Sequence, residues 1–340
     1  MPRMRAEAGI SERSHEEGAS TARVRALWRT LARFAPGATV TDVGTPLEWQ
    51  REAASPPRVA PMPVVETGPS IRAVAGSAAA FGGFLDGVQE SRVALWLPGG
   101  APVVIARVGA VILQRTARTL SVWPHGVRDR TLVIAPRVRV EPAMWEALSA
   151  AMPLVDSAVE DEVCHPESLL AKAVHVVEQA RAAEERALAE RWATDGVSPL
   201  CVDGSIATLG DAAHAPRIVG LVKSHRTLVS APEAIPALLT LPEGHRTAVV
   251  ELTGSHHRSR VWTWYLRLRA PRAADPLFGL VRIEIADHGE ATARADDVSR
   301  WVMAERTPLA LPDARWDVMP YGIARCESYL KRGLGLRATA

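Results

Sequence analysis

The sequence lacks several features that would indicate common classes of protein. Its three cysteines, Cys164, Cys201 and Cys326, have no paired CxxC spacing, which argues against a zinc knuckle and against a disulfide framework. No apolar run is long enough to span a membrane, and the first residues contain no apolar core of the signal-peptide type. These absences predict a soluble, cytoplasmic protein that does not enter a membrane.

Lysine is also scarce, although the composition otherwise fits a folded enzyme. Apolar residues make up 47% of the chain and charged residues 23%, a balance typical of globular proteins and not of disordered ones. The formal net charge is only +2, and most basic side chains are arginines, which bind phosphate or carboxylate groups in a bidentate manner. Binding to nucleic acid is compatible with this composition but is not indicated by it.

We predict two regions, an N-terminal extension over residues 1–75 and a main domain over residues 76–340. In the extension, apolar residues recur at helical spacing over residues 24–34, which predicts one amphipathic helix. Its arginines are interpreted as a solvated face in preference to a DNA contact. Five prolines over residues 53–69 then predict an irregular linker.

The main domain reads as a mixed α/β fold in which strands precede and follow a long helix. A strand meander turns at the PGG sequence over residues 98–100, and the strand of PLCVDG is apolar on both faces, so it should be central in the sheet. The order of elements predicts an α/β layout with one large sheet. Strands are predicted over 81–115, 131–140, 199–210, 218–225, 246–254, 261–270 and 279–286, and helices over 166–192, 293–305 and 319–334.

Two aspartates have the same local context although more than a hundred residues separate them. Asp86 is followed by glycine in the strand GGFLDG, and Asp203 is followed by glycine in the strand PLCVDG. An aspartate at a strand end is held by a rigid element, and the glycine leaves room for a metal or phosphate near the backbone. Taken singly, each Asp-Gly pair is more simply a turn after a strand.

The order of motifs resembles the NurA nuclease family between about Phe81 and Leu334. The matching stretches are LDGVQES with its hairpin WLPGGAPVVIARVGAV, the acidic helix RAAEERALAERWATDGVSPLCVDGSIA, the strand IVGLVKSH, and the later strands WYLRL and VRIEI. The resemblance implies a ribonuclease H-like mixed sheet flanked by helices, related to the PIWI domain of Argonaute proteins. It also implies a metal-dependent deoxyribonuclease that forms a homodimer and works with a hexameric HerA-type translocase.

The resemblance requires a third carboxylate from the long helix, and helical geometry ranks the candidates. The apolar residues of the helix define a buried face that Glu184 and Glu185 flank on either side, whereas Glu190 points away from it. We prefer Glu185, with Glu184 as the alternative. Either glutamate would be an ordinary solvated residue if the resemblance did not hold.

A fourth ligand is implied near the C-terminus, where the sequence departs from the family. The family has a Tyr-Pro segment leading to Ala-His, and aligning it with MPYGIARCESYLK places Cys326 at the alanine and Glu327 at the histidine. A carboxylate there keeps a ligand and favours oxygen coordination of Mg²⁺ or Mn²⁺. It is also consistent with a weakened enzyme, or with an exposed helix residue of no catalytic role.

Six other residues could contribute to the site or to the fold around it. Lys223 lies on a predicted strand and would bind the scissile phosphate as a point charge. His256 and His257 are adjacent and are interpreted as a polar turn, and Glu284 is interpreted as a structural ion pair. Trp262 and Trp264 share one face of a strand, for which core packing is favoured over stacking on DNA bases.

The hypothesis from the sequence is therefore hydrolysis of DNA phosphodiesters by two Mg²⁺ or Mn²⁺ ions. Asp86 would bridge both ions, and Asp203, Glu185 and Glu327 would complete the coordination, in DNA end resection and repair or in antiviral defence. Two alternatives remain open at this point. One is a catalytically inactive DNA-binding or scaffold subunit of the translocase, and the other is a metal-dependent hydrolase of small phosphate compounds.

Overall fold

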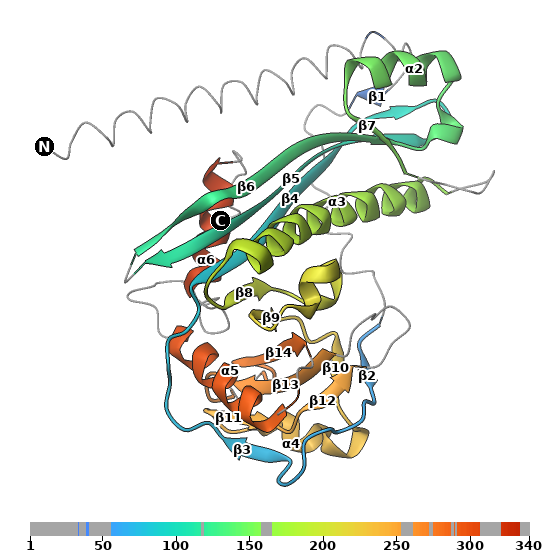
Figure 1. Cartoon of the computed structure of the whole chain (residues 1–340). Coiled ribbons are helices and arrows are strands. Elements are labelled where there is room, and N and C mark those ends of the chain that lie inside the picture. Colours follow the sequence, from blue (N-terminus) through green and yellow to red (C-terminus); the bar gives the residue numbers. More distant parts are fainter. Residues whose placement is uncertain are drawn as a thin grey trace, which may run out of the picture.

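The computed structural model describes most of residues 76–340, the predicted main domain, and parts of residues 1–75, the predicted N-terminal extension (Figure 1). The predicted helix over residues 24–34 lies outside the described residues except for residue 33, and so do Cys164, His256 and His257. Among the described residues, no helix combines the length and the apolar character needed to cross a membrane. The described residues are 33, 39–40, 56–116, 119–157, 165–252, 261–271, 275–286, 289, 291–306 and 321–333.

One large sheet of twelve strands organises these residues, in the order β3-β11-β13-β14-β9-β8-β4-β5-β6-β7, with β1 paired to β4 and β12 to β13. A separate pair joins β2 to β10. The strands are β1 (Thr39–Val40), β2 (Arg58–Ala60), β3 (Ile71–Ala73), β4 (Gly83–Leu97), β5 (Ala101–Thr116), β6 (Thr119–Ala135), β7 (Leu154–Asp156), β8 (Leu200–Asp203), β9 (Ile218–Val222), β10 (Thr227–Val229), β11 (His245–Thr247), β12 (Val250–Leu252), β13 (Val261–Arg267) and β14 (Leu280–Ala286).

Helices cover both faces of the sheet. The long helix α3 (Pro166–Asp195) runs along β4, β5 and β6, whereas α6 (Tyr321–Gly333) packs against β4 and β5 (Figure 1). The other helices are α2 (Pro142–Ala151), α4 (Ile235–Leu239) and α5 (Ala291–Glu305), with short 3-10 turns at Arg137–Arg139, Ile206–Thr208, Gly210–His214 and Pro232–Ala234.

The sheet is mixed, as the sequence predicted. β4, β5 and β6 form an antiparallel meander. On the other side of β4, β8 pairs parallel to β4 and β9 pairs parallel to β8. The PGG turn between β4 and β5 is also confirmed, because Gly99 and Gly100 both adopt positive φ angles, which glycine tolerates. The predicted fold class, a mixed α/β sheet flanked by helices, is confirmed.

Several predicted boundaries were wrong for identifiable reasons. β6 begins at Thr119 and not at residue 131, because its WPHG segment is a bulge inside the strand, where His125 has a φ of 56°. The single strand predicted over 246–254 is divided into β11 and β12. The short helix α2 was not predicted. Residues 58–60, expected in the irregular linker, form β2, and residues 71–73, in the predicted extension, form β3.

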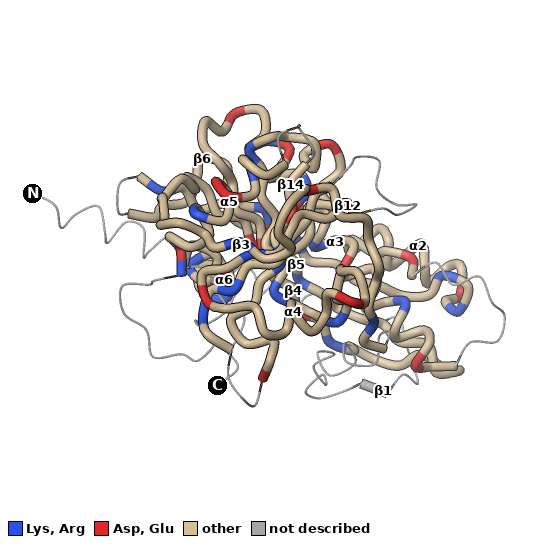
Figure 2. The backbone as a smooth tube through the Cα atoms, turned by 90° about the horizontal axis from the view of Figure 1, so that it is seen from below, with Lys and Arg blue, Asp and Glu red and all other residues tan. Residues whose placement is uncertain are grey.

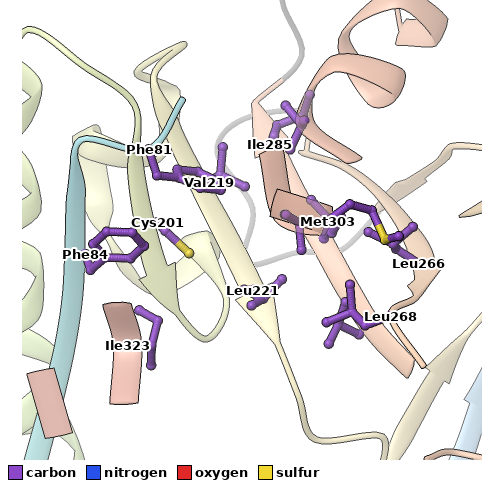
Figure 3. Close-up of a cluster of buried hydrophobic side chains, with 14 of the residues drawn as sticks. Phe81, Phe84, Cys201, Val219, Leu221, Leu266, Leu268, Ile285, Met303 and Ile323 are labelled. Atoms are coloured by element: carbon purple, nitrogen blue, oxygen red, sulfur yellow. The ribbon is translucent and has the colours of Figure 1, made fainter. Parts of the chain in front are cut away.

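Two of the apolar clusters lie on opposite faces of the sheet at β4 and β8. The cluster in Figure 3 joins β4, β8, β9, β13 and β14 to α5 and α6, and includes Phe84, Cys201, Leu221 and Ile323. Trp262 and Trp264 belong to it and are buried, which confirms the prediction of core packing. The second cluster packs α3 against the opposite face through residues such as Leu85, Leu188, Trp192 and Val202. Neighbouring residues of β4 and β8 thus point to opposite helix layers.

Candidate functional site

Strand pairing places Asp86 beside Asp203. β4 and β8 are parallel, with Phe84 opposite Cys201 and Leu85 opposite Val202, so the next pair in this register is Asp86 and Asp203. Asp203 ends β8, as predicted. Asp86 does not end its strand, however, because β4 continues through Gly87 to Leu97 while remaining paired with β5. The two aspartates therefore meet where β8 stops and β4 continues.

Lys223 reaches the same point from the neighbouring strand. β9 pairs with β8 so that Leu221 is opposite Asp203, and Lys223 follows the last residue of β9 instead of lying within the strand as predicted. Its ammonium group lies 2.7 and 2.8 Å from the two carboxylate oxygens of Asp203. By the alternation of strand residues, Asp203 and Lys223 point to the same face as Cys201 and Leu221, the face covered by α6.

Helix α6 approaches β4 closely enough to bring Glu327 near Asp86. A Cβ atom on Gly322 would lie 2.2 Å from the ring of Phe84, so only glycine allows this approach. The thiol of Cys326 donates a hydrogen bond to the carbonyl of Phe84 at 3.1 Å. The next residue, Glu327, contributes to the electrostatic potential at Asp86 and is also paired with Lys331 at 2.7 Å.

Helix α3 brings Glu185 to the site from the opposite layer. A Cβ atom on Gly87 would lie 2.1 Å from Oε1 of Glu185, so the absence of a side chain at residue 87 leaves room for this carboxylate. The sequence had suggested that the space was for a metal or a phosphate; in the structure the Glu185 side chain fills it. Arg181, one helical turn earlier, binds the Glu185 carboxylate and donates to Gln89 at 3.1 Å.

The other two glutamates of α3 have different environments. Glu184 is buried and binds arginines of β6, with Arg128 at 2.6 Å and Arg130 at 3.6 Å. Glu190 is exposed, as the helical geometry predicted. Glu185 interacts electrostatically with Asp86 and with Asp203, so it is the α3 glutamate that the structure brings to the two aspartates.

The electrostatics of the site show an excess of negative charge. Burial raises the pKa of Asp86 well above its usual range, Asp203, Glu185 and Glu327 raise it further, and Lys223 opposes the shift. The pKa of Glu185 is raised to about 7 by burial and by Asp203, against the opposing effect of Arg181. Such shifts mark carboxylates that would be stabilised by an additional cation.

The candidate ligands are not preassembled around one point. Within the described ranges, no group of three or more His, Cys, Asp or Glu side chains is arranged to hold a metal ion. Lys223 and Arg181 instead bind the carboxylates of Asp203 and Glu185. Burial raises the pKa values of Cys201 and Cys326 well above the usual range, which keeps these thiols protonated and leaves oxygen as the available ligand type.

The turn after Asp203 is held by a residue from another strand. Glu284 on β14 forms an ion pair with Arg282 at 2.9 Å, which confirms the predicted structural ion pair. It also accepts hydrogen bonds from Ser205 Oγ at 2.7 Å and from the backbone N–H of Ile206 at 3.0 Å. The sequence analysis missed this contact, and it missed Arg181, whose only sequence signal was its i,i+4 spacing from Glu185.

In the rest of the described chain, acidic and basic residues are not separated into different regions. Figure 2 shows basic and acidic positions interspersed along the described part of the chain instead of gathered into one extended surface of a single sign. This agrees with the small net charge of +2. Long-range attraction of a polyanion is therefore expected to be weak, and recognition would depend on local contacts.

Comparisons with known proteins find similarity among solved structures. No protein-family model matches the chain, and no curated protein sequence matches it. Among solved structures, the chain is similar to the crystal structure of the NurA nuclease from Sulfolobus solfataricus, with a TM-score of 0.48 and 10% sequence identity. The match covers 76% of this chain and 81% of that chain.

Proposed function

We propose that this protein is a metal-dependent nuclease that hydrolyses DNA phosphodiesters, with Asp86, Asp203, Glu185 and Glu327 as ligands of two Mg²⁺ or Mn²⁺ ions. The observation that carries the proposal is the buried carboxylate of Asp86, on which the other three carboxylates all act. Four acids close enough to interact electrostatically cost stability unless cations offset their charge. The proposed cations serve this purpose and give the cluster a chemical use.

The chemistry of the donor set fits hard divalent ions. All four proposed ligands are carboxylates, the ligand type that Mg²⁺ and Mn²⁺ prefer. In the structure, Lys223 and Arg181 supply the positive charge at Asp203 and Glu185. Metal binding would therefore require these two ion pairs to open and the carboxylates to turn toward the ions, which accounts for the lack of a preassembled site.

Each residue has a distinct task in the proposed reaction. Bound divalent ions would activate water and stabilise the leaving oxygen, as in other two-metal hydrolases. Asp86 and Asp203 are held by the backbone of adjacent strands, which fixes their separation. Once released from Asp203, the Lys223 ammonium group would contact the scissile phosphate. Gly87 allows Glu185 to approach the strand closely.

The partners of the reaction are proposed from the motif order in the sequence. We propose that the protein acts as a cytoplasmic homodimer and receives DNA from a hexameric HerA-type translocase, in end resection and repair or in antiviral defence. A direct test is copurification of the two proteins, followed by cleavage assays with and without the translocase and ATP. This part of the proposal would be contradicted if the two proteins did not copurify and if the translocase and ATP did not change the rate of DNA cleavage.

The catalytic proposal is tested with purified protein and linear DNA. Single- and double-stranded substrates should be degraded in the presence of Mn²⁺ or Mg²⁺, and chelation should stop the reaction. The variants Asp86→Ala and Asp203→Ala should lose cleavage while keeping the circular dichroism spectrum of the wild type. Full activity in both variants would show that the proposed site is wrong.

A second candidate, an inactive DNA-binding or scaffold subunit, is favoured by two specific observations. The carboxylates are neutralised in part by Lys223 and Arg181, and Glu327 stands where the family that the sequence resembles has histidine. Such a protein would bind DNA or the translocase but would never cut DNA, even with Mn²⁺ and the translocase supplied. Cleavage of nucleotide or sugar phosphates in place of DNA would instead indicate a small-molecule hydrolase.

A further inference from the structure

We propose that Glu284 is a positioning residue that fixes the direction of Asp203 by holding the turn over residues 204–206. This inference rests on the proposed function, because it assigns Asp203 a task that depends on accurate placement. Glu284 does not itself reach the carboxylate cluster. It acts through the backbone and the serine that follow Asp203.

The contacts of Glu284 lie on both sides of a fully buried carboxylate. Its residue exposure is 0%, and Oε2 accepts both from Ser205 Oγ at 2.7 Å and from the Ile206 N–H at 3.0 Å. Its other oxygen, Oε1, lies 2.9 Å from Nη2 of Arg282 without forming a hydrogen bond, so the directed contacts of the carboxylate are those of Oε2. Hydrogen bonds to a charged acceptor are stronger than those between neutral groups.

The turn over residues 204–206 has an uncommon backbone conformation that contacts from neighbouring strands hold in place. Gly204 has a φ of +114°, a conformation that side-chain-bearing residues rarely adopt, and its N–H donates to the carbonyl of Leu221 at 3.0 Å. Gly220 lies opposite Glu284 in the sheet, and a Cβ atom there would lie 2.7 Å from the carbonyl oxygen of Gly204. Strands β9 and β14 thus hold the turn together.

Stability alone is a weak explanation for a charged residue at this position. A buried ion pair can often be replaced by apolar residues without loss of stability, because the removal of two charges from water is costly. A carboxylate at residue 284 does supply what an apolar residue cannot, namely an acceptor shared by Ser205 and Ile206. This shared acceptor sets the path of the chain directly after Asp203.

The main test measures metal dependence in the full-length protein. In Glu284→Ala, the Mn²⁺ concentration for half-maximal DNA cleavage should rise about 10- to 100-fold, the range found when residues that orient metal ligands are removed. Glu284→Gln keeps an oxygen that can accept from Ser205 and Ile206, so it should recover most of the wild-type metal dependence. It also provides a second measurement if Glu284→Ala does not fold.

Glu66 provides a matched control for loss of a buried ion pair. Its side chain is also fully buried, binds Arg246 at 2.7 Å and accepts from the backbone N–H of Val249 at 2.9 Å. Glu66→Gln should lower the melting temperature but leave the Mn²⁺ requirement unchanged when cleavage is measured well below that temperature. An equal rise in the Mn²⁺ requirement in Glu66→Gln and Glu284→Ala would overturn the proposal.

Amide hydrogen exchange separates failure of this inference from failure of the proposed function. If Glu284 anchors the turn, exchange at Ile206 should accelerate at least tenfold in Glu284→Ala, with a smaller change in Glu284→Gln, whether or not the wild type cuts DNA. An unchanged exchange rate at Ile206 would overturn the positioning role. Absence of DNA cleavage by the wild type, together with accelerated exchange in the variant, would overturn only the nuclease assignment.

Discussion

The surroundings of Glu66 and Asp86 show two opposite ways to bury a carboxylate. Both are nearly inaccessible to water, at 5% and 7% exposure. Burial alone would raise the pKa of Glu66, but hydrogen bonds from Arg246 and from the Val249 N–H, with the charges of Arg246 and Arg72, bring it below its ordinary value. Around Asp86, the burial effect is reinforced by three more carboxylates and opposed by Lys223.

This difference distinguishes a structural carboxylate from a candidate functional one. Glu66 joins the segment between β2 and β3 to β11, and its partners satisfy both of its oxygens. Asp86 accepts a hydrogen bond from the adjacent N–H of Gly87 at 2.8 Å and lies among like charges. Carboxylates that a fold leaves undercompensated are good candidates for cation binding. Substitutions at these carboxylates and at Gly87 test this contrast.

Asp86→Asn should reduce DNA cleavage by a factor of about 10³ or more, because the amide removes the negative charge that would hold the metal ions. Single-turnover assays at saturating Mn²⁺ would measure the loss. Glu190→Gln is a suitable control, since this exposed glutamate belongs to the same charged helix as Glu185. If Asp86→Asn cleaved DNA at the wild-type rate, Asp86 would not have the functional role that distinguishes it from Glu66.

Glu66→Ala should lower the free energy of unfolding by about 3–5 kcal/mol, because it leaves the fully buried Arg246 without its buried partner. Chemical denaturation followed by tryptophan fluorescence would measure the change. The variant should cut DNA at the wild-type rate at temperatures where it is folded. A loss below about 1 kcal/mol would show that Asp296, the other partner of Arg246, compensates alone.

Gly87→Ala should weaken the site through geometry and leave its charge unchanged. The new Cβ would meet the Glu185 carboxylate, so this side chain must move away from β4. We expect cleavage to fall about 10- to 100-fold and stability to fall by about 1–3 kcal/mol, the scale of overpacking. Gly76→Ala tests a glycine with open space around its Cβ position but a positive φ, and should affect stability alone. Unchanged cleavage in Gly87→Ala would exclude Glu185 from the site.

The smallest expected effect is on the pH dependence of stability. Variants of Glu66 and Asp86 should differ from the wild type in opposite directions, and both differences should depend on pH. The pKa of Glu66 is lowered on folding, so its stabilisation is complete above the unfolded value near 4.5 and is lost as the pH falls through the folded pKa. The pKa of Asp86 is raised, so its ionisation costs stability in the metal-free protein; this cost is absent below the unfolded value of 3.8 and grows as the pH rises towards the raised pKa.

At pH 7 without metal, Glu66→Gln should therefore be less stable than the wild type, and Asp86→Asn should be more stable by an amount on the order of 1 kcal/mol. Both differences should shrink as the pH is lowered. Melting temperatures measured from about pH 3 to pH 8 with a chelator present would show this. If Asp86→Asn is less stable than the wild type at pH 7, then the Asp86 carboxylate stabilises the metal-free protein, and the proposed difference from Glu66 is wrong.

Local patterns predicted those parts of the fold that depend on neighbouring residues. The PGG turn, the helix α3 and the buried strand β8 follow from turn chemistry and apolar periodicity, and these predictions were confirmed. The WPHG bulge was missed, because proline and glycine ordinarily end a strand, whereas here β6 continues past them.

The environment of the candidate site depended on contacts that no local pattern contains. Helical geometry predicted that Glu190 would point outward, but it could not separate Glu184 from Glu185, because that choice depends on Arg128 of β6 and on the missing side chain of Gly87. The two Asp-Gly pairs looked alike in sequence and proved different. Gly204 is needed for its φ angle, whereas Gly87 is needed for space.

The close packing of α6 against Phe84 has a consequence for the order in which the proposed site forms during synthesis of the chain. Asp86, Glu185 and Asp203 leave the ribosome before Glu327, and Glu327 reaches Asp86 only when α6 docks through Gly322 and Cys326. The full set of carboxylates is therefore assembled last, after the rest of the sheet has been made. A chain interrupted before residue 321 would carry three of the four proposed carboxylate ligands, so the proposed site can be completed only after α6 has been made.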